Sequence, residues 1–228
     1  MTKWTRLFVW CGAGLFVASL AVCTWWYTVR LARPHPYAGW TPLLSDALLF
    51  TVFAMHHSIF ALATVKRGLA RALPGELLRS IYVWTASVLL ILVCALWQPV
   101  GGEMYWVTGW RGVLHAGVQL AGLWVIARSV AAIDPLELAG IPTRPGTGDT
   151  LQEAGPYRWV RHPLYLGWML VVFGAAHMTG DRLTFAAISS LYLVVAIPWE
   201  ERSLADAFGD HYSRYKQQVR WRLVPYVF

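Results

Sequence analysis

Residues 155–167 read Gly-Pro-Tyr-Arg-Trp-Val-Arg-His-Pro-Leu-Tyr-Leu-Gly, a basic and aromatic segment that runs directly into an apolar stretch. Six of its side chains can hydrogen-bond or carry charge. Pro163 suits the first turn of a helix, because the N–H that proline lacks is not needed there. The residues before it are then held at a helix N-terminus, where amides and the helix dipole favour anions. We therefore expect a binding site where the chain enters this helix.

The composition is that of an integral membrane protein. Of the 228 residues, 57% are hydrophobic and 14% are charged, whereas a soluble domain carries about 25% charged residues. The 14 Trp and 10 Tyr residues suit the aromatic belts at membrane interfaces. We predict an all-α, multi-pass protein that forms one membrane domain over residues 1–228, with no soluble domain appended.

The apolar runs predict about six membrane helices, four within residues 1–133 and two within 134–228. Residues 134–162 read as a loop, marked by Pro135, Pro142, Pro145 and the turn residues 146–149. The last two runs are short for a bilayer core of ~30 Å, which a lone helix needs about 20 residues to cross. They therefore predict a helical hairpin packed inside a bundle. The runs are 7–29, 43–63, 81–98, 112–127, 163–178 and 183–199.

Lys and Arg residues are distributed unevenly between the two ends of these spans. Two precede the first span, four lie in 64–80, four in 128–162 and five follow residue 200, whereas the opposite side holds four. The positive-inside rule places both termini in the cytoplasm, and a bacterial inner membrane is the expected location. Since this pattern and the net charge of +7 suit anionic headgroups, membrane lipids are the expected partner and nucleic acid is not.

The tail after residue 200 reads as an amphipathic helix. Apolar and polar positions recur every four residues from Glu200 to Tyr212, and Gly209 is expected to interrupt the helix. A basic run close to the membrane follows, which is typical of contact with lipid headgroups. The run comprises Arg214, Lys216, Arg220 and Arg222.

The predicted hairpin brings two polar clusters to one membrane face, Arg161-His162 at its entry and Glu200-Glu201 at its exit. Adjacent residues lie about 100° apart on a helix, so one glutamate can face the bundle while the other meets solvent. Acids at a membrane boundary are usually paired or functional. An ion pair with Arg158 or Arg161 is the structural alternative to a role in binding or catalysis.

The ordered motifs around these clusters resemble a known family. They are Gly-Pro-Tyr at 155–157, Arg-His-Pro-x-Tyr-x-Gly at 161–167, Glu-Glu-x-x-Leu at 200–204 and Phe-Gly-x-x-Tyr-x-x-Tyr at 208–215. This pattern is similar to that of the membrane methyltransferases related to isoprenylcysteine carboxyl methyltransferase. The resemblance implies S-adenosylmethionine as the cofactor, bound at the cytoplasmic end under the C-terminal segment.

The front half is similar to the branch that contains NnrU proteins and methanethiol S-methyltransferase. Residues 133–140, Ile-Asp-Pro-Leu-Glu-Leu-Ala-Gly, resemble that branch's Ile-Asp-His-Phe-Glu-Leu-Phe-Gly and depart from it at Pro135 and Ala139. This branch favours a small or lipid-soluble thiol as the methyl acceptor, with a prenylcysteine carboxylate or a lipid amine as alternatives. The other similar stretches are 55–58, 65–67, 79–82 and 96–99.

The residue chemistry of the motifs suits a sulfonium cofactor. Aromatic ring faces can contact the sulfonium or adenine, Arg161 can hold a carboxylate bidentately, and Glu200 or Glu201 can accept from ribose hydroxyls or the ammonium group. His162 can hydrogen-bond the cofactor or orient a neighbour. The candidate catalytic residues are Arg161, His162, Glu200 and Glu201, and the sequence does not choose a general base among them. The further candidate cofactor residues are Gly155, Tyr157, Pro163, Tyr165, Gly167, Tyr212 and Tyr215.

Two other classes of function remain open. A membrane reductase using NADPH is the enzymatic alternative, since sterol-reductase folds resemble the C-terminal hairpin. A haem or transport protein is the non-enzymatic one, and it requires histidine pairs at matched depth. The sequence does not offer them, because His115 and His177 fall near the outer face whereas His56, next to His57, falls deeper. No metal site is predicted, because Cys11, Cys23 and Cys94 all fall within apolar runs without ligand spacing.

Overall fold

The computed structural model describes the chain except residues 1, 62–64, 66–67, 70, 72–73 and 142–149. The predicted loop residues 142–149 and the basic residues Lys66 and Arg67 lie outside the described residues. Within the described part, five helices are long and apolar enough to cross a membrane, and Pro163–Phe173 is a shorter apolar helix. The predicted all-α, multi-pass fold is therefore confirmed, and the protein is an integral membrane protein.

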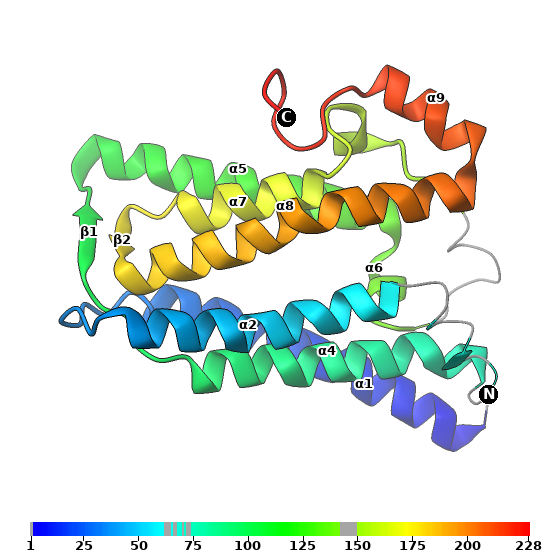
Figure 1. Cartoon of the computed structure of the whole chain (residues 1–228), viewed down its shortest axis with the longest axis horizontal. Coiled ribbons are helices and arrows are strands. Elements are labelled where there is room, and N and C mark those ends of the chain that lie inside the picture. Colours follow the sequence, from blue (N-terminus) through cyan, green and yellow to red (C-terminus); the bar gives the residue numbers. More distant parts are fainter. Residues whose placement is uncertain (1, 62–64, 66–67, 70, 72–73, 142–149) are drawn as a thin grey trace. The chain divides into compact units, whose positions relative to one another are not determined.

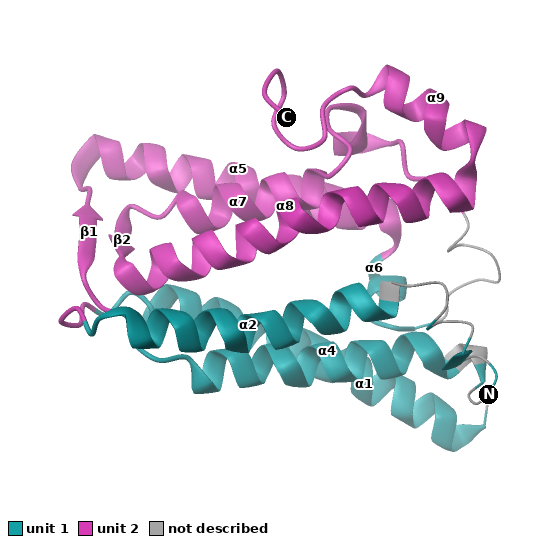
Figure 2. Cartoon of the chain, in the orientation of Figure 1, with its two compact units in different colours: residues 1–33, 38–100, 135–145 teal, residues 34–37, 101–134, 146–228 magenta. Residues whose placement is uncertain are grey.

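The chain divides into two compact units whose segments alternate along the sequence (Figure 2). Unit 1 comprises Met1–Arg33, Ala38–Val100 and Pro135–Pro145. Unit 2 comprises Pro34–Tyr37, Gly101–Asp134 and Gly146–Phe228, and it contains all the candidate site residues.

Unit 1 is built on helices α1 and α4, which pack side by side (Figure 1). The hydroxyl of Thr2 accepts from the backbone N–H of Thr5 and caps α1. Gly12 leaves room for the indole of Trp84, whose Nε1 donates to the carbonyl of Phe8 at 3.1 Å. The elements are α1 (Lys3–Trp25), the π-helix η1 (Trp26–Arg30), α2 (Trp40–Ala61), α4 (Gly75–Leu96) and α6 (Pro135–Leu138).

Unit 2 contains the predicted hairpin, formed by α7 and α8. Strand β1 pairs antiparallel with β2, with Trp106 opposite His177 and Glu103 opposite Thr179. The elements are β1 (Glu103–Trp106), α5 (Gly109–Ile133), the 3₁₀ turn η3 (Gly155–Arg158), α7 (Pro163–Phe173), β2 (His177–Thr179), α8 (Gly180–Phe208) and α9 (Asp210–Gln218).

The ends of these elements match the sequence signals closely. Pro163 is the first residue of α7, and Gly209, with a φ of 52°, separates α8 from α9 as expected. The apolar run over 163–178 is helical only as far as Phe173, because the chain turns at Gly174 and its last residues pair with β1. The prediction of a loop throughout 134–162 was wrong at α6 and η3, where Pro135 and Pro156 lie in the first turn of short helices.

Helices α5 and α7 cross at two glycines. A Cβ added at Gly167 would lie 2.8 Å from the carbonyl oxygen of Gly122, and one at Gly122 would lie 2.7 Å from that of Gly167. Small residues at such a crossing let two membrane helices approach through their backbones. The close approach that Gly167 permits is therefore to the backbone of α5.

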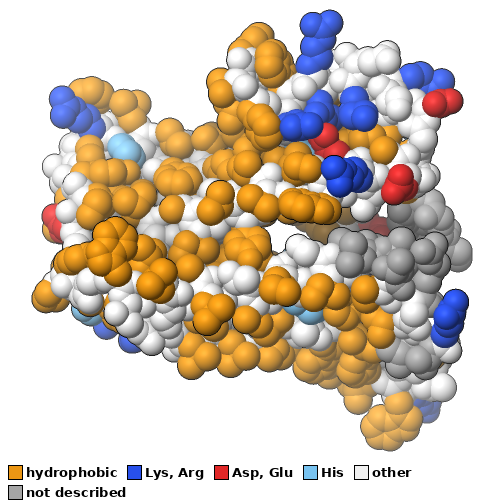
Figure 3. Space-filling view, in the orientation of Figure 1, with side chains coloured by type: hydrophobic (Ala, Val, Ile, Leu, Met, Phe, Trp, Pro, Cys, Tyr) orange, Lys and Arg blue, Asp and Glu red, His pale blue; other side chains and the backbone are white. Residues whose placement is uncertain are grey.

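Hydrophobic side chains cover much of the visible face along the helices (Figure 3). Leu48 in α2, Leu120 in α5 and Leu191 in α8 are all at least 64% exposed. Water disfavours such surfaces, whereas lipid tails match them. This distribution is the one expected of helices that meet lipid.

Candidate active site

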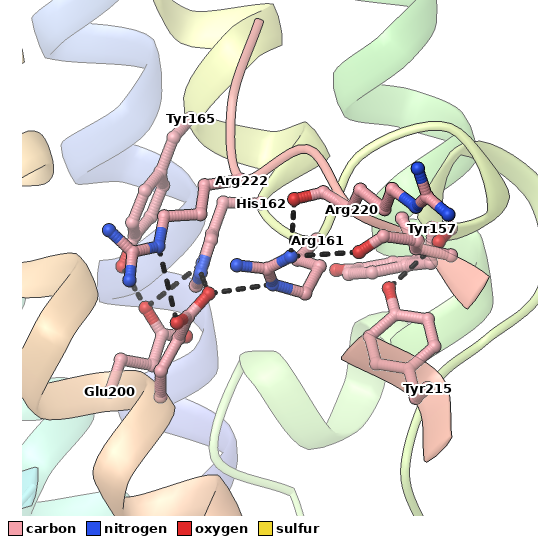
Figure 4. A network of polar contacts seen from close by, with 10 residues as sticks. Tyr157, Arg161, His162, Tyr165, Glu200, Tyr215, Arg220 and Arg222 are labelled. Atoms are coloured by element: carbon pink, nitrogen blue, oxygen red, sulfur yellow. Dashed lines mark hydrogen bonds and ion pairs between the residues drawn. The ribbon is translucent and has the colours of Figure 1, made fainter. Parts of the chain in front are cut away.

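The site lies at the mouth of the α7–α8 hairpin, where the chain enters one helix and leaves the other. His162 is the N-cap residue of α7, and Glu200 and Glu201 lie in the last third of α8. Figure 4 shows the side chain of His162 directed toward Glu200, with Arg222 of the tail beside it. Arg161 Nε lies 2.7 Å from Oε1 of Glu201. The predicted convergence of the two polar clusters is thus present in the structure.

Glu201 is the buried centre of the cluster, with a side chain only 10% exposed. Its Oε1 accepts a hydrogen bond from Arg161 Nε at 2.7 Å and lies 3.4 Å from His162 Nε2. Its Oε2 lies 3.3 Å from Nε of Arg222. Three basic groups therefore surround one carboxylate, which compensates for its removal from water.

Glu200 occupies the outer side of the same helix turn, with a side chain 44% exposed. The hydroxyl of Tyr165 donates to its Oε2 at 2.7 Å, and Nδ1 of His162 lies 3.5 Å from the same oxygen. The prediction that one glutamate faces the protein and the other faces outward is confirmed. Glu200 is the carboxylate that retains room for a ligand.

His162 lies between the two glutamates, and its side chain is only 4% exposed. Burial by itself lowers the pKa of an imidazole, but the hydrogen bonds and charges of Glu200 and Glu201 outweigh that effect and raise the pKa of His162 above its ordinary 6.5. The ring stacks on Tyr165 with centroids 5.4 Å apart. Because both ring nitrogens face carboxylates, the doubly protonated imidazolium fits this environment.

Arg161 fastens the tail to the start of α7. Its Nη1 donates to the carbonyls of Val219 and Arg220, both at 2.8 Å. The backbone N–H of Arg161 donates to Trp221 O at 3.0 Å, and that of His162 donates to Arg222 O at 2.8 Å. The structural alternative expected from the sequence, an ion pair between a glutamate and Arg158 or Arg161, is present at Arg161. Arg161 also holds residues 219–222 in place.

The tyrosines of the C-terminal motif pack beside this network. The hydroxyl of Tyr215 donates to the carbonyl of Tyr157 at 2.7 Å, and burial raises the pKa of both phenols. Tyr212 is fully buried, and its hydroxyl has no hydrogen-bond partner in the described part of the chain. Tyr212, Tyr215 and Val219 form a small apolar core that fixes α9 against the loop before η3.

A pocket of about 550 Å³ opens between that loop and α9. This volume lies within the ~300–1,000 Å³ of small-molecule sites. Of the candidates taken from the sequence, Tyr215 lines the pocket. Gly155, with a φ of 60°, makes the turn that directly follows the lining residue Ala154 in the chain. The lining residues are Leu151, Gln152, Glu153, Ala154, Arg158, Tyr215, Gln218 and Val219.

Sequence reasoning missed most of this lining. The signal available was the polar pair Gln152-Glu153 directly before the Gly155-Pro156 turn, together with Gln218 at the end of α9. The structure thus sorts the candidates into two groups within unit 2. Arg161, His162, Tyr165, Glu200 and Glu201 form the hairpin cluster, whereas Tyr157, Tyr212 and Tyr215 lie beside the pocket.

Comparison with known proteins identifies the class of enzyme. Residues 112–211 match the phospholipid methyltransferase family, a range that includes the whole hairpin cluster. No solved structure matches the chain.

Three relatives show the extent of the similarity. Methanethiol S-methyltransferase 2 of Bradyrhizobium diazoefficiens is 35% identical over 194 residues, which cover 82% of this chain and 74% of the relative. Methanethiol S-methyltransferase of Crocosphaera subtropica is 33% identical over 195 residues, covering 82% and 76%. Nurim of Xenopus laevis is 32% identical over 166 residues, covering 65% and 57%. The chain therefore carries a phospholipid methyltransferase domain and belongs to the same family of membrane methyltransferases as the methanethiol S-methyltransferases.

Proposed function

We propose that this protein transfers a methyl group from S-adenosylmethionine to a small thiol that is soluble in lipid, as the names of its bacterial relatives suggest. The observation that carries the proposal is the similarity to methanethiol S-methyltransferases over 82% of the chain. The range that matches the family, 112–211, includes the hairpin mouth, which is built from ionisable side chains. Methanethiol is the first acceptor to test.

The residues present fit the cofactor. The buried hydroxyl of Tyr212 has no partner in the described chain, the carboxylate of Glu200 is partly exposed, and the pocket beside Tyr215 has the volume of a small-molecule site. S-adenosylmethionine would supply a methyl group on a cationic sulfur. Tyrosine rings and carboxylates are the groups that attract such a cation.

Glu200 is the carboxylate available to the reactants. Glu201 is already surrounded by Arg161, His162 and Arg222. We assign Glu201 to positioning, because its contacts hold the entry to α7 and the tail together. We assign Glu200 to contact with the cofactor or the acceptor.

The proposed reaction forms one carbon–sulfur bond to the acceptor as the carbon–sulfur bond of the donor breaks. The thiol proton must leave, since thiols have pKa values near ~8.5 and the thiolate is the nucleophile. Glu200 accepts this proton. His162, whose raised pKa favours its protonated form, donates hydrogen bonds to the glutamates and keeps Glu200 in place.

We further propose that both termini face the cytoplasm of a bacterial inner membrane, which puts the hairpin mouth on the cytoplasmic side. The support is the excess of Lys and Arg in the tail and in 128–162. Figure 3 shows Lys and Arg side chains gathered at the end of unit 2 where the tail lies.

Mass spectrometry of products from a panel of acceptors tests the proposal. The purified protein with S-adenosylmethionine should methylate methanethiol and other small thiols in preference to prenylcysteines and lipid amines. S-adenosylmethionine, and not NADPH, should raise its unfolding temperature. Methylation confined to a prenylcysteine carboxylate or an amine would reject the thiol assignment, and stabilisation by NADPH alone would favour a reductase.

A further inference from the structure

The tail beyond α9 combines buried anchors with an exposed loop. Val219 and Leu223 are only 7% and 3% exposed, whereas Tyr226 and Val227 are 87% and 77% exposed. The loop closes on itself, because the N–H of Leu223 donates to Phe228 O at 2.8 Å and that of Phe228 donates to Val224 O at 3.0 Å. Residues 223–228, called the terminal loop below, thus present large apolar side chains outward from a fixed base.

Hydrogen bonds attach the base of the terminal loop to the start of the apolar helix α7. Trp221 and Arg222 accept from the backbone N–H groups of Arg161 and His162, which directly precede the apolar helix α7. At the same level of unit 2, Trp159 stacks on Trp124 with ring centroids 5.8 Å apart, and each is 52% exposed. Exposed Trp and Tyr at the end of a membrane helix are typical of the interfacial aromatic belt.

The charges around the terminal loop complement an anionic surface. Arg214 and Arg220 are exposed, and neither forms an ion pair with any residue that the structure describes. Tyr226 has a φ of 66°, a left-handed conformation that costs free energy in a residue other than glycine. An unfavourable turn that holds apolar side chains outward beside unpaired arginines is suited to a lipid interface.

We propose that the terminal loop inserts into the headgroup region of an anionic bilayer, with Arg220 on lipid phosphates. Arg222 connects this contact to the active site, because its guanidinium lies 5.3 Å from the centroid of the Phe228 ring and its Nε lies 3.3 Å from Glu201. Insertion fixes Phe228, and thereby the arginine that helps to hold Glu201. The charge of the surrounding lipid therefore affects the order of the hairpin mouth.

Depth-dependent quenching tests the insertion in the full-length chain. In a Cys11→Ser background, which leaves the buried Cys23 and Cys94, a fluorophore on Val227→Cys is compared with one on Asp210→Cys in α9. In nanodiscs of phosphatidylglycerol, lipids with a nitroxide near the headgroup should quench the Val227 label more than the Asp210 label, and iodide should do the reverse. Equal quenching of the Val227 label by iodide would overturn the proposal. So would a label shielded from both quenchers in a dimer, because a second copy would then cover the loop.

A charge comparison tests the coupling to the site. The unfolding temperature should be higher in phosphatidylglycerol than in phosphatidylcholine nanodiscs, and Arg220→Gln should remove most of that difference. Arg202→Gln, which removes the same charge from an exposed position on α8, is the matched control and should preserve the difference. An equal loss in both variants would indicate a general charge effect and overturn the proposal. Neither measurement uses a methyl donor, so its result is distinguishable from a failure of the proposed methyltransferase activity.

Discussion

Arg161 and Glu201 form an ion pair of 2.7 Å between side chains that are only 7% and 10% exposed. The arginine comes from the entry to α7 and the glutamate from α8, so the pair joins the two ends of the hairpin. Breaking a buried pair by removing one partner typically costs ~3–5 kcal/mol, because the remaining charge is left uncompensated.

Glu201→Gln should therefore destabilise the protein by ~3–5 kcal/mol. Chemical unfolding in detergent micelles measures the change, and Arg202→Gln at the neighbouring exposed position should leave stability nearly unchanged. The double variant Arg161→Met/Glu201→Leu should recover part of the loss, since apolar replacements of a buried pair are often neutral. A Glu201→Gln protein as stable as the wild type would show that the pair contributes little.

Gly167→Ala should destabilise the crossing of α5 and α7 by ~1–3 kcal/mol, because the added methyl overpacks a closed interface. Gly117→Ala is the matched control on α5, where an added Cβ meets nothing within 4 Å. It should be neutral or stabilising by up to ~1 kcal/mol, owing to the higher helix propensity of alanine. Unfolding temperatures of both variants check the prediction, and equal effects would contradict the packing role.

The stability that His162 contributes should depend on pH. Its pKa is raised above 6.5 in the folded protein, so its contribution is fully present below that value and is lost as the pH rises through the raised pKa. The difference in unfolding temperature between wild type and His162→Gln should therefore be largest at the acidic end of the pH range and should decrease as the pH rises. A difference that grows with pH would mean that the neutral imidazole is the stabilising form.

Glu200→Gln should lower kcat for thiol methylation by a factor of ~10²–10⁴, the usual range for loss of a general base. Tyr165→Phe, which removes one hydrogen bond to that carboxylate, should cost only about tenfold, equivalent to ~1.4 kcal/mol. Rates at saturating acceptor over a range of pH distinguish the two roles. If the Glu200→Gln enzyme kept its full kcat, Glu200 would not be the group that accepts the thiol proton.

Ala154→Trp should block the pocket beside Tyr215 and weaken binding of S-adenosylmethionine without unfolding the protein, because Ala154 is exposed and lines that pocket. Isothermal titration measures the affinity and a thermal melt measures the fold. Leu136→Trp, an exposed position in α6 of unit 1, serves as the control for an added indole. Unchanged affinity in Ala154→Trp would place the cofactor elsewhere.

Much of the fold followed from the sequence because the signals were local. Pro163 and Gly209 mark the ends of helices through their own backbone preferences, and adjacent glutamates on a helix must point about 100° apart. The hairpin then brought Arg161-His162 and Glu200-Glu201 together by chain connectivity. For these features, residue type and spacing were enough.

The remaining features depend on contacts between distant segments. The pairing of β1 with β2 joins residues more than 70 positions apart, and short apolar runs do not reveal a strand partner. The hydrogen bonds from Arg161 and His162 to residues 219–222 involve backbone carbonyls, which carry no sequence signal. The pocket was missed for the same reason, since its wall is shared by the loop before η3 and the end of α9.

The glycine crossing of α5 and α7 has a mechanical consequence. Because the two backbones touch at Gly122 and Gly167, neither helix can slide or tilt without a clash, and the pair acts as a rigid strut. Reactants must nevertheless enter and leave a site at one end of that strut. The tail over 219–222 is held to the strut by four hydrogen bonds at Arg161 and His162, and it therefore belongs to the fixed framework of the site. Any movement that admits reactants would accordingly have to come from elements outside this framework.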